Sequence, residues 1–250
     1  MRESTRLTGN VLGARIDAIS WAAALDRLLG WARARDSRYV TICNVHVVVS
    51  ASRDAAYRDI INCADMATPD GAPVAWMLRR QGFAGQPRIS GPDLMWALCE
   101  RCAAEGLPIY CYGSTDATLA RLAQRLRAAF PALKLAVESP PFRALTPEED
   151  AAAVARIHES GAGIVFVGLG CPKQERWMAE HRGRVNAVMI GVGAAFDFHA
   201  GTVKRAPEWM RNNGLEWLHR LLSEPRRLWK RYLVTNTLFV VGAARQLFLK

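Results

Sequence analysis

The sequence lacks the features that define a membrane-spanning or secreted chain. None of its apolar runs reaches the ~20 residues that a membrane-spanning helix needs. The longest run, residues 233–244, is interrupted by Thr235, Asn236 and Thr237. No apolar signal segment follows the polar first six residues. We therefore expect a chain that does not span a membrane.

A metal or disulfide pattern is also missing. Cys99 and Cys102 form a single C-x-x-C within a helical pattern, without a second pair or histidines at ligand spacing. We expect the six cysteines to be buried free thiols, as in a reducing cytoplasm. The histidines lack common metal spacing and are expected to be surface or packing residues. They are His46, His158, His181, His199 and His219.

The composition is that of a folded chain with an anionic partner. Half of the 250 residues are apolar, which is enough for a substantial core with a small appendage. The formal net charge of +10 indicates a nucleotide, a nucleic acid or an acidic membrane surface, and does not choose among them.

Strand and helix patterns alternate over most of the chain. The expected strands are residues 39–43, 66–68, 109–112, 134–137, 163–167 and 187–192. The expected helices are residues 17–33, 45–49, 73–80, 92–104, 116–130, 147–159 and a helix that begins at Pro172. Such repeated units predict an α/β, Rossmann-like fold, with a mainly parallel sheet and helices on both faces.

The composition changes near residue 203. Residues 204–231 are rich in Arg, Lys and Trp and have a helical pattern, and an apolar tail follows. We therefore divide the chain into an α/β catalytic domain, residues 1–202, and a basic helical appendage, residues 203–250.

Residues 163–177 are the most informative segment. A continuous apolar run, residues 164–167, indicates a strand that is buried on both faces. Gly168 and Gly170 allow a tight turn, and Pro172 suits the start of a helix whose free N–H groups can receive an anion. Lys173 and Gln174 follow at once. The segment is either a phosphate site or an ordinary strand-to-helix connection.

The sequence Gly168-Leu-Gly-Cys-Pro-Lys-Gln-Glu-Arg-Trp177 resembles the signature of the WecG/TagA/CpsF family, glycosyltransferase family 26. Further motifs in the same order extend the resemblance over about residues 40–232. The resemblance implies an inverting enzyme that moves a sugar from a UDP-sugar to an undecaprenyl-diphosphate-linked saccharide. Such a step serves exopolysaccharide, teichoic acid or enterobacterial common antigen synthesis, at the cytoplasmic face of the membrane.

Asp70 is the expected catalytic base. On its own, Pro69-Asp70-Gly71 indicates a β-turn. The surrounding segment, residues 64–71, resembles the family segment whose aspartate is the proposed base, which would take a proton from the acceptor hydroxyl. Asp65 is the competing carboxylate and is expected to be a helix-end or surface group.

Asn44 follows the strand at residues 40–43 and either caps the next helix or faces the active pocket. The family has Thr-x-Asn at this place. Here Ile42 occupies the Thr position, and Thr41 lies one place earlier, on the other strand face. The resemblance implies that Asn44, together with Gln174, orients the sugar or the acceptor.

Arg88 lies in a segment that resembles the family's Arg-x-x-Gly-x-Asp. Its planar guanidinium could neutralise a diphosphate. Alternatively, Arg88 forms a structural ion pair, for which Asp93 is the suggested partner, and Asp93 is itself placed to cap the following helix. Asp70, Asn44, Gln174 and Arg88 form the expected catalytic set.

Two other turns are candidates for substrate binding. Tyr112-Gly113-Ser114-Thr115 opens a helix after a strand and could cradle a phosphate or ribose. Asp197, in a segment that matches the family, either contacts the sugar or nucleotide or orients a neighbouring loop. The expected substrate-binding residues are Thr41, Gly113, Ser114, Gly168, Gly170, Lys173, Glu175, Asp197, Arg220, Arg227 and Arg231.

The basic-aromatic tail could bind nucleic acid, rest on anionic lipid, or pack as an ordinary helix. No nucleic-acid motif accompanies it, so we expect no nucleic-acid partner. Residues 214–227 resemble the family's C-terminal appendage, which docks on the membrane and covers the active site with arginines. Arg220, Arg227 and Arg231 are the candidates, and Arg226 or Lys230 could replace either of the last two.

No Asp-x-Asp motif occurs, although many sugar-nucleotide transferases hold a divalent ion with it. We therefore expect no metal and no other cofactor, with the leaving-group charge stabilised by cations and helix N-termini. The resemblance implies a donor of N-acetylmannosamine, its uronic acid, glucose or galactose, since the family uses all of these, and the sequence does not choose among them. A homo-oligomer is also allowed.

Two other classes of protein are alternatives to a glycosyltransferase. A dinucleotide-dependent oxidoreductase should show Gly-x-Gly-x-x-Gly after its first strand, but residues 41–46 contain no glycine and Gly168-x-Gly170 lacks the third. A non-catalytic basic module that binds membrane or nucleic acid would explain the net charge. It would leave the Pro-Asp-Gly and Lys-Gln-Glu loops without a role.

Overall fold

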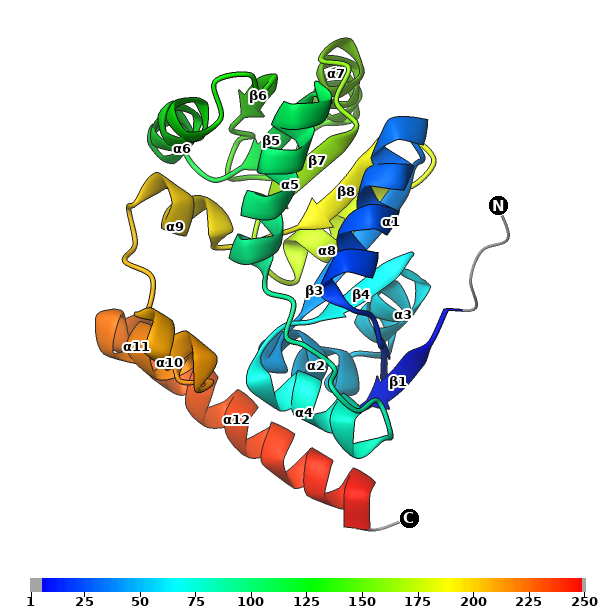
Figure 1. Cartoon of the computed structure of the whole chain (residues 1–250), viewed down its shortest axis with the longest axis vertical. Helices are drawn as coiled ribbons and strands as arrows, with labels where there is room; N and C mark the ends of the chain where they lie inside the picture. Colours follow the sequence, from blue (N-terminus) through cyan, green and yellow to red (C-terminus); the bar gives the residue numbers. More distant parts are fainter. Residues whose placement is uncertain (1–5, 249–250) are drawn as a thin grey trace. The chain divides into compact units, whose positions relative to one another are not determined.

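The computed structural model describes residues 6–248. Its main element is a six-stranded sheet with the strand order β4-β3-β8-β7-β5-β6, flanked by helices (Figure 1). The strands are β3 (Arg38–Cys43), β4 (Met66–Pro69), β5 (Ile109–Gly113), β6 (Leu135–Glu138), β7 (Ile164–Gly168) and β8 (Val188–Gly191). The pairings of β3 with β8, β8 with β7, β7 with β5 and β5 with β6 are parallel. The predicted α/β, Rossmann-like fold class is confirmed.

Within residues 6–248 the chain forms two compact units. Unit 1 contains the chain up to Ser20, Ile42–Ser90 and the chain from Lys204 onward, and unit 2 contains Trp21–Thr41 and Gly91–Val203. The division into residues 1–202 and 203–250 rests on composition and stays a prediction. In the structure, the chain from Lys204 onward belongs to the same compact unit as the chain up to Ser20 and Ile42–Ser90.

Unit 1 begins with an antiparallel hairpin that we did not predict. Its strands are β1 (Thr8–Val11) and β2 (Ala14–Asp17), joined by Leu12 and Gly13, which both have positive φ. The two-residue turn suits a hairpin because its twist matches that of the strands. The helices of unit 1 are α2 (Val45–Arg53), α3 (Ala55–Cys63), α4 (Ala72–Arg80), α10 (Glu208–Asn212), α11 (Glu216–Ser223) and α12 (Pro225–Phe248).

The expected helix over residues 17–33 was wrong at its start. Asp17 ends β2, and its carboxylate accepts hydrogen bonds from Arg6, at 2.7 Å, and from the Ala67 amide, at 2.6 Å. Because these contacts hold Asp17 in the hairpin, the helix begins only at Trp21.

Unit 2 contains the helices that cover the central strands. They are α1 (Trp21–Ala34), α5 (Gly91–Glu105), α6 (Asp116–Ala129), α7 (Pro147–Glu159), α8 (Lys173–His181) and α9 (Ala195–Ala200). Helices α1 and α5 pack on each other, and α8 packs on β7 and β8 (Figure 1). Residues 164–167 are fully buried, as expected for a parallel strand that is covered on both faces.

The last helix, α12, packs along α2 and α11 within unit 1 (Figure 1). It buries Leu228, Phe239 and Ala243 and leaves an apolar surface exposed. The exposed apolar residues of α12 are Trp229, Leu233, Val234, Leu238, Val240, Val241 and Phe248. Across residues 6–248, no helix combines the length and the apolar character needed to cross a membrane.

Gly113 and Gly168 lie opposite each other in the paired strands β5 and β7. A Cβ atom on Gly113 would lie 2.6 Å from the Gly168 carbonyl carbon, and the φ of Gly113 is +126°. These glycines therefore allow two strand ends to approach closely, and a side chain at Gly113 would force them apart.

We expect Gly113→Ala to lower the free energy of unfolding by about 3 kcal/mol or more, because backbone strain and steric overlap add. The control is Gly106→Ala, at a φ of +67° with no atom within 4 Å of the added Cβ. Strain alone should cost about 1–2 kcal/mol there. Urea unfolding measures both, and equal losses would contradict the close-approach argument.

Candidate active site

Asp70 is held where β4 turns into α4. Its amide donates to the Cys43 carbonyl at 3.0 Å, and the Ile89 amide donates to the Pro69 carbonyl at 2.9 Å. The Pro-Asp-Gly turn therefore lies between the end of β3 and the segment that precedes α5. The turn reading and the functional reading are compatible, because the turn presents the Asp70 carboxylate at a strand end.

The Asp70 carboxylate pairs with Arg88. Arg88 Nε donates to Asp70 Oδ1 at 3.0 Å, and Arg88 Nη2 donates to the carboxylate of Glu216 on α11. The exposed fractions of the side chains are 16% for Asp70, 23% for Arg88 and 13% for Glu216. The predicted ion pair of Arg88 exists, but its partners are Asp70 and Glu216 rather than the suggested Asp93.

Burial raises the pKa of Asp70 above its usual value of 3.8. The positive charge of Arg88 opposes this shift, and the negative charge of Glu216 adds to it. Burial acts to lower the pKa of Arg88, but its two carboxylate partners raise it above the usual range. Arg88 therefore stays cationic, and Asp70 is a stronger proton acceptor than an aspartate in water.

Asn44 caps α2. Its side-chain oxygen accepts from the Val47 amide at 3.2 Å, and its side chain is exposed. Thr41 has no exposed surface on β3, so the structure gives it no access to a ligand. The capping alternative for Asn44 is thus observed, and its orienting role stays a prediction.

The three tail arginines lie on α11 and α12. Arg227 pairs with Glu224 at 2.6 Å, and Arg231 lies close enough to His46 to lower the pKa of that histidine, an effect second to burial. Arg220 lies in the last turn of α11. Sequence reasoning missed Glu216, the tail residue that reaches the Asp70–Arg88 pair. An acidic residue in a segment this rich in arginine was a usable signal.

Unit 2 contains a pocket of about 730 Å³, within the 300–1,000 Å³ that ligand pockets usually span. It lies at the carboxyl ends of β5 and β7, and its lining includes Ser114, Gly168 and the α8 side chains Lys173, Arg176 and Trp177. The loop at residues 140–147 forms another wall. The pocket thus combines cations with apolar and aromatic surface.

An aromatic stack forms part of the pocket. Trp177 lies between Tyr112 and His181, with ring centroids 4.8 Å and 3.9 Å away. His181 is held by Asp150, whose other carboxylate oxygen bonds Arg184 at 2.6 Å. His181 Nδ1 lies 2.7 Å from the Trp177 carbonyl. Tyr112 and His181 are buried and Trp177 is half-buried, so these contacts fix the rings as a rigid wall of the pocket.

Gln174 and Glu175 are buried in the first turn of α8, next to the pocket. Gln174 Nε2 donates to Glu175 Oε1 at 2.8 Å, and Gln174 Oε1 has no hydrogen-bond partner. The Gln174 amide lies against Gly191, at the end of β8. Pro172 is the N-cap, so α8 begins at Lys173, one residue later than expected.

The remaining predicted residues have observed structural roles. Gly168 gives room to the Phe196 ring, which would lie 2.5 Å from an added Cβ. Gly170 has a φ of +79°, and no atom lies within 4 Å of the position that an added Cβ would take. The Ser114 carbonyl accepts from the Ser139 hydroxyl at 2.9 Å. The Asp197 carbonyl accepts from the amides of Thr202 and Val203, which fits the loop-orienting alternative.

No three His, Cys, Asp or Glu side chains within residues 6–248 are grouped as a metal site would require. The expectation of metal independence itself stays a prediction.

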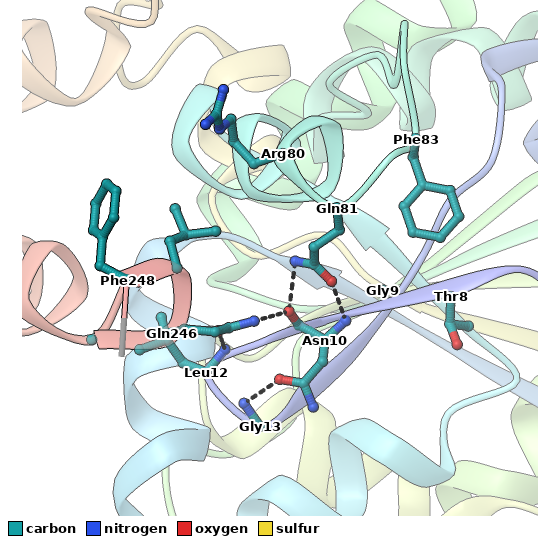
Figure 2. Close-up of a pocket in the computed structure, with 12 residues that line it drawn as sticks. Thr8, Gly9, Asn10, Leu12, Gly13, Arg80, Gln81, Phe83, Gln246 and Phe248 are labelled. Carbon is teal, nitrogen blue, oxygen red and sulfur yellow. Dashed lines mark hydrogen bonds between the residues drawn. The ribbon is translucent and has the colours of Figure 1, made fainter. Parts of the chain in front are cut away.

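A second pocket, of about 890 Å³, lies in unit 1 between the hairpin, the end of α4 and the end of α12 (Figure 2). Its polar groups bond to one another. The Asn10 carbonyl accepts from Gln81 Nε2 at 2.8 Å and from Gln246 Nε2 at 2.6 Å, and the Leu12 amide donates to Gln246 Oε1 at 2.9 Å. These bonds fasten α12 to the hairpin and indicate a structural contact.

The Rossmann-like sheet carries a largely buried acid–arginine pair at the end of β4 and a cationic, aromatic pocket at the ends of β5 and β7, and open parallel sheets commonly bind their ligands at such strand ends. The model of the glycosyl transferase WecG/TagA/CpsF family matches residues 9–250, and the chain belongs to this family. It is therefore a glycosyltransferase of a family that serves the synthesis of cell-wall and surface polysaccharides.

We expect Arg88→Gln to lower the free energy of unfolding by about 3 kcal/mol, because Asp70 and Glu216 would then be partly buried carboxylates without their cation. The control is Arg79→Gln, which removes an exposed arginine of α4 and should change stability by less than about 0.5 kcal/mol. Urea unfolding at pH 7 compares the two. Equal stability of the variants would mean that the pair adds nothing to the fold.

Proposed function

We propose that this glycosyltransferase moves a sugar from a UDP-sugar to an undecaprenyl-diphosphate-linked saccharide with inversion at the anomeric carbon. Asp70 takes the proton from the acceptor hydroxyl, and the hydroxyl oxygen attacks the anomeric carbon from the face opposite UDP. The sugar–oxygen bond to UDP breaks as the new bond forms, and UDP leaves with the electron pair.

The observation that carries this proposal is the environment of Asp70. Its carboxylate is at a strand end, is largely buried and has a raised pKa. These are the properties of a general base that works near neutral pH. Arg88 is the nearest cation to the base, at 3.0 Å, and would stabilise negative charge on the reacting groups.

The unit 2 pocket supports a nucleotide donor. Its aromatic wall offers apolar contact to a base, chiefly through the half-buried Trp177, and Lys173, Arg176 and Arg184 supply positive charge for phosphates. Gln174 has a buried side-chain oxygen without a hydrogen-bond partner, and this oxygen would accept a hydrogen bond from a sugar hydroxyl. The family consists of glycosyltransferases, which does not fit the oxidoreductase alternative.

The tail supports a lipid-linked acceptor. Helix α12 exposes Trp229, Leu233 and Val240 together with Arg226 and Lys230. Apolar and basic side chains on one exposed helix favour an anionic membrane surface. We therefore propose a peripheral location on the inner face of the cell membrane, with substrate arginines among Arg220, Arg227 and Arg231.

Asp70→Asn should abolish transfer, because an amide cannot accept the proton, while UDP binding stays within about twofold. Activity is measured as UDP release from UDP-N-acetylmannosamine, UDP-glucose and UDP-galactose in the presence of bacterial membrane lipid extract. Asp65→Asn is the matched control and should retain turnover. Unchanged turnover of Asp70→Asn would remove Asp70 from the role of base.

Trp177→Ala should weaken UDP binding by about tenfold, because it removes the half-buried ring of the pocket wall, and truncating an aromatic anchor in a binding site typically costs about 1 kcal/mol or more. Isothermal titration calorimetry with UDP measures the loss. Trp31→Ala is the control in the same unit, since Trp31 packs near Arg38 and does not line the pocket. Unchanged affinity of Trp177→Ala would place the nucleotide elsewhere.

A further inference from the structure

Glu216 is the first residue of α11, and its carboxylate binds two arginines. One oxygen bonds Arg88 Nη2, and the other lies 3.5 Å from Arg205 Nε. Arg205 Nη2 also donates to the Ser90 hydroxyl at 3.4 Å. With Asp70, these side chains form a row of alternating charge: Asp70, Arg88, Glu216, Arg205. The row is neutral as a whole.

The row is shielded from solvent. The exposed fraction is below one quarter for each of its four charged side chains. Charges in such surroundings interact more strongly than at an exposed surface, because less water screens them. A change at Glu216 therefore reaches Asp70 through a single intervening guanidinium.

An ion pair of Glu216 could serve only to attach α11 to the rest of unit 1. Any exposed arginine could be its partner in that role, and it would not have to be Arg88, which binds Asp70. Glu216 binds Nη2 of the same planar group whose Nε binds Asp70. Because the guanidinium is rigid, fixing one side of it sets the direction of its other N–H groups.

We propose that Glu216 is a positioning residue for the transfer reaction. It holds the Arg88 guanidinium in the orientation that serves Asp70, and it shares the charge of Arg88 with Asp70, so that docking of α11 completes the base. The proposal rests on the role of Asp70 proposed above. It assigns an acidic residue of the appendage to the chemistry, in addition to the arginines expected to bind substrate.

The electrostatics agree with this geometry. The charge of Arg88 lowers the pKa of Asp70, and that of Glu216 raises it. Without Glu216, Asp70 would face the undivided charge of Arg88, and its pKa would fall. The elements that pack on α11 carry further charged residues. These are Glu208, Arg211, Arg226, Arg227, Lys230 and Arg231, of which Glu208, Arg226, Arg227 and Lys230 are exposed.

The sign of the effect on activity follows. A base acts in its ionised form, so turnover falls as the pH drops through the pKa of Asp70. In Glu216→Gln this acid limb should move to lower pH, and kcat on the plateau should fall about tenfold, because a weaker and less well oriented base accepts the proton less readily. The KM for the donor should change by less than about twofold.

The test uses the full-length protein and whichever UDP-sugar of the panel above gives turnover with membrane lipid extract. kcat and KM are measured from pH 5 to pH 9 for the wild type, Glu216→Gln, Glu216→Asp and Glu208→Gln. Glu208→Gln removes the same charge from an exposed position on α10 and should match the wild type. Glu216→Asp keeps the charge, so its acid limb should stay where that of the wild type lies.

A second measurement does not need turnover. The side-chain carboxyl carbon of Asp70, assigned by its absence in Asp70→Asn, is titrated by NMR in the wild type and in Glu216→Gln. Its midpoint should fall in the variant. An unchanged midpoint, or an activity loss without a shift of the acid limb, would overturn the proposal and leave Glu216 as a fastening residue.

The two proposals fail in distinguishable ways. Turnover in Asp70→Asn would contradict the proposed role of Asp70 as the base, and with it the role of Glu216 that depends on it. An inactive Asp70→Asn, combined with an unshifted acid limb in Glu216→Gln, would sink only the role of Glu216. If Glu216→Gln does not fold, the test uses Glu216→Asp, which keeps the negative charge. The titration midpoint of Asp70 should then stay at its wild-type value, and a lowered midpoint would contradict the proposal.

Discussion

The guanidinium of Arg88 is the contact on which the candidate chemistry depends. It joins the turn after β4, through Asp70, to the first turn of α11, through Glu216. Two ionised carboxylates in a partly buried place repel each other unless a cation lies between them. Arg88 therefore supports the fold of unit 1 and, together with burial, determines the pKa of Asp70. In the proposed mechanism, the fold and the reaction depend on the same ion pair.

Unit 2 contains the pocket that we propose for a planar, charged ligand. The rings of Tyr112, Trp177 and His181 are stacked, and Asp150 fixes the last of them by a hydrogen bond of 2.9 Å. Since the stack is already ordered, a ligand that lies on it loses little side-chain entropy of the protein. Cations on α8 and at Arg184 surround this surface. The arrangement suits a nucleotide better than a neutral sugar.

The sequence predicted what local pattern determines. Continuous apolar runs revealed β5 and β7, and the helix over residues 147–159 was predicted with its observed bounds. Family motifs pointed to Asp70, which the structure places beside Arg88. The partners in long-range contacts were not predictable: Asp17 is held in the hairpin by Arg6 and by the amide of Ala67 in β4, and Glu216 bonds an arginine 128 residues away. No local pattern encodes such pairs.

The bond between the Leu12 amide and Gln246 joins the first hairpin to the last helix, 234 residues apart in the chain. The Asn10 carbonyl accepts from the same glutamine. The Leu12 amide proton should exchange with water more slowly while Gln246 accepts it, so its exchange rate reports whether α12 is seated on the hairpin. A single proton near the start of the chain thus senses the state of the surface that would meet the lipid.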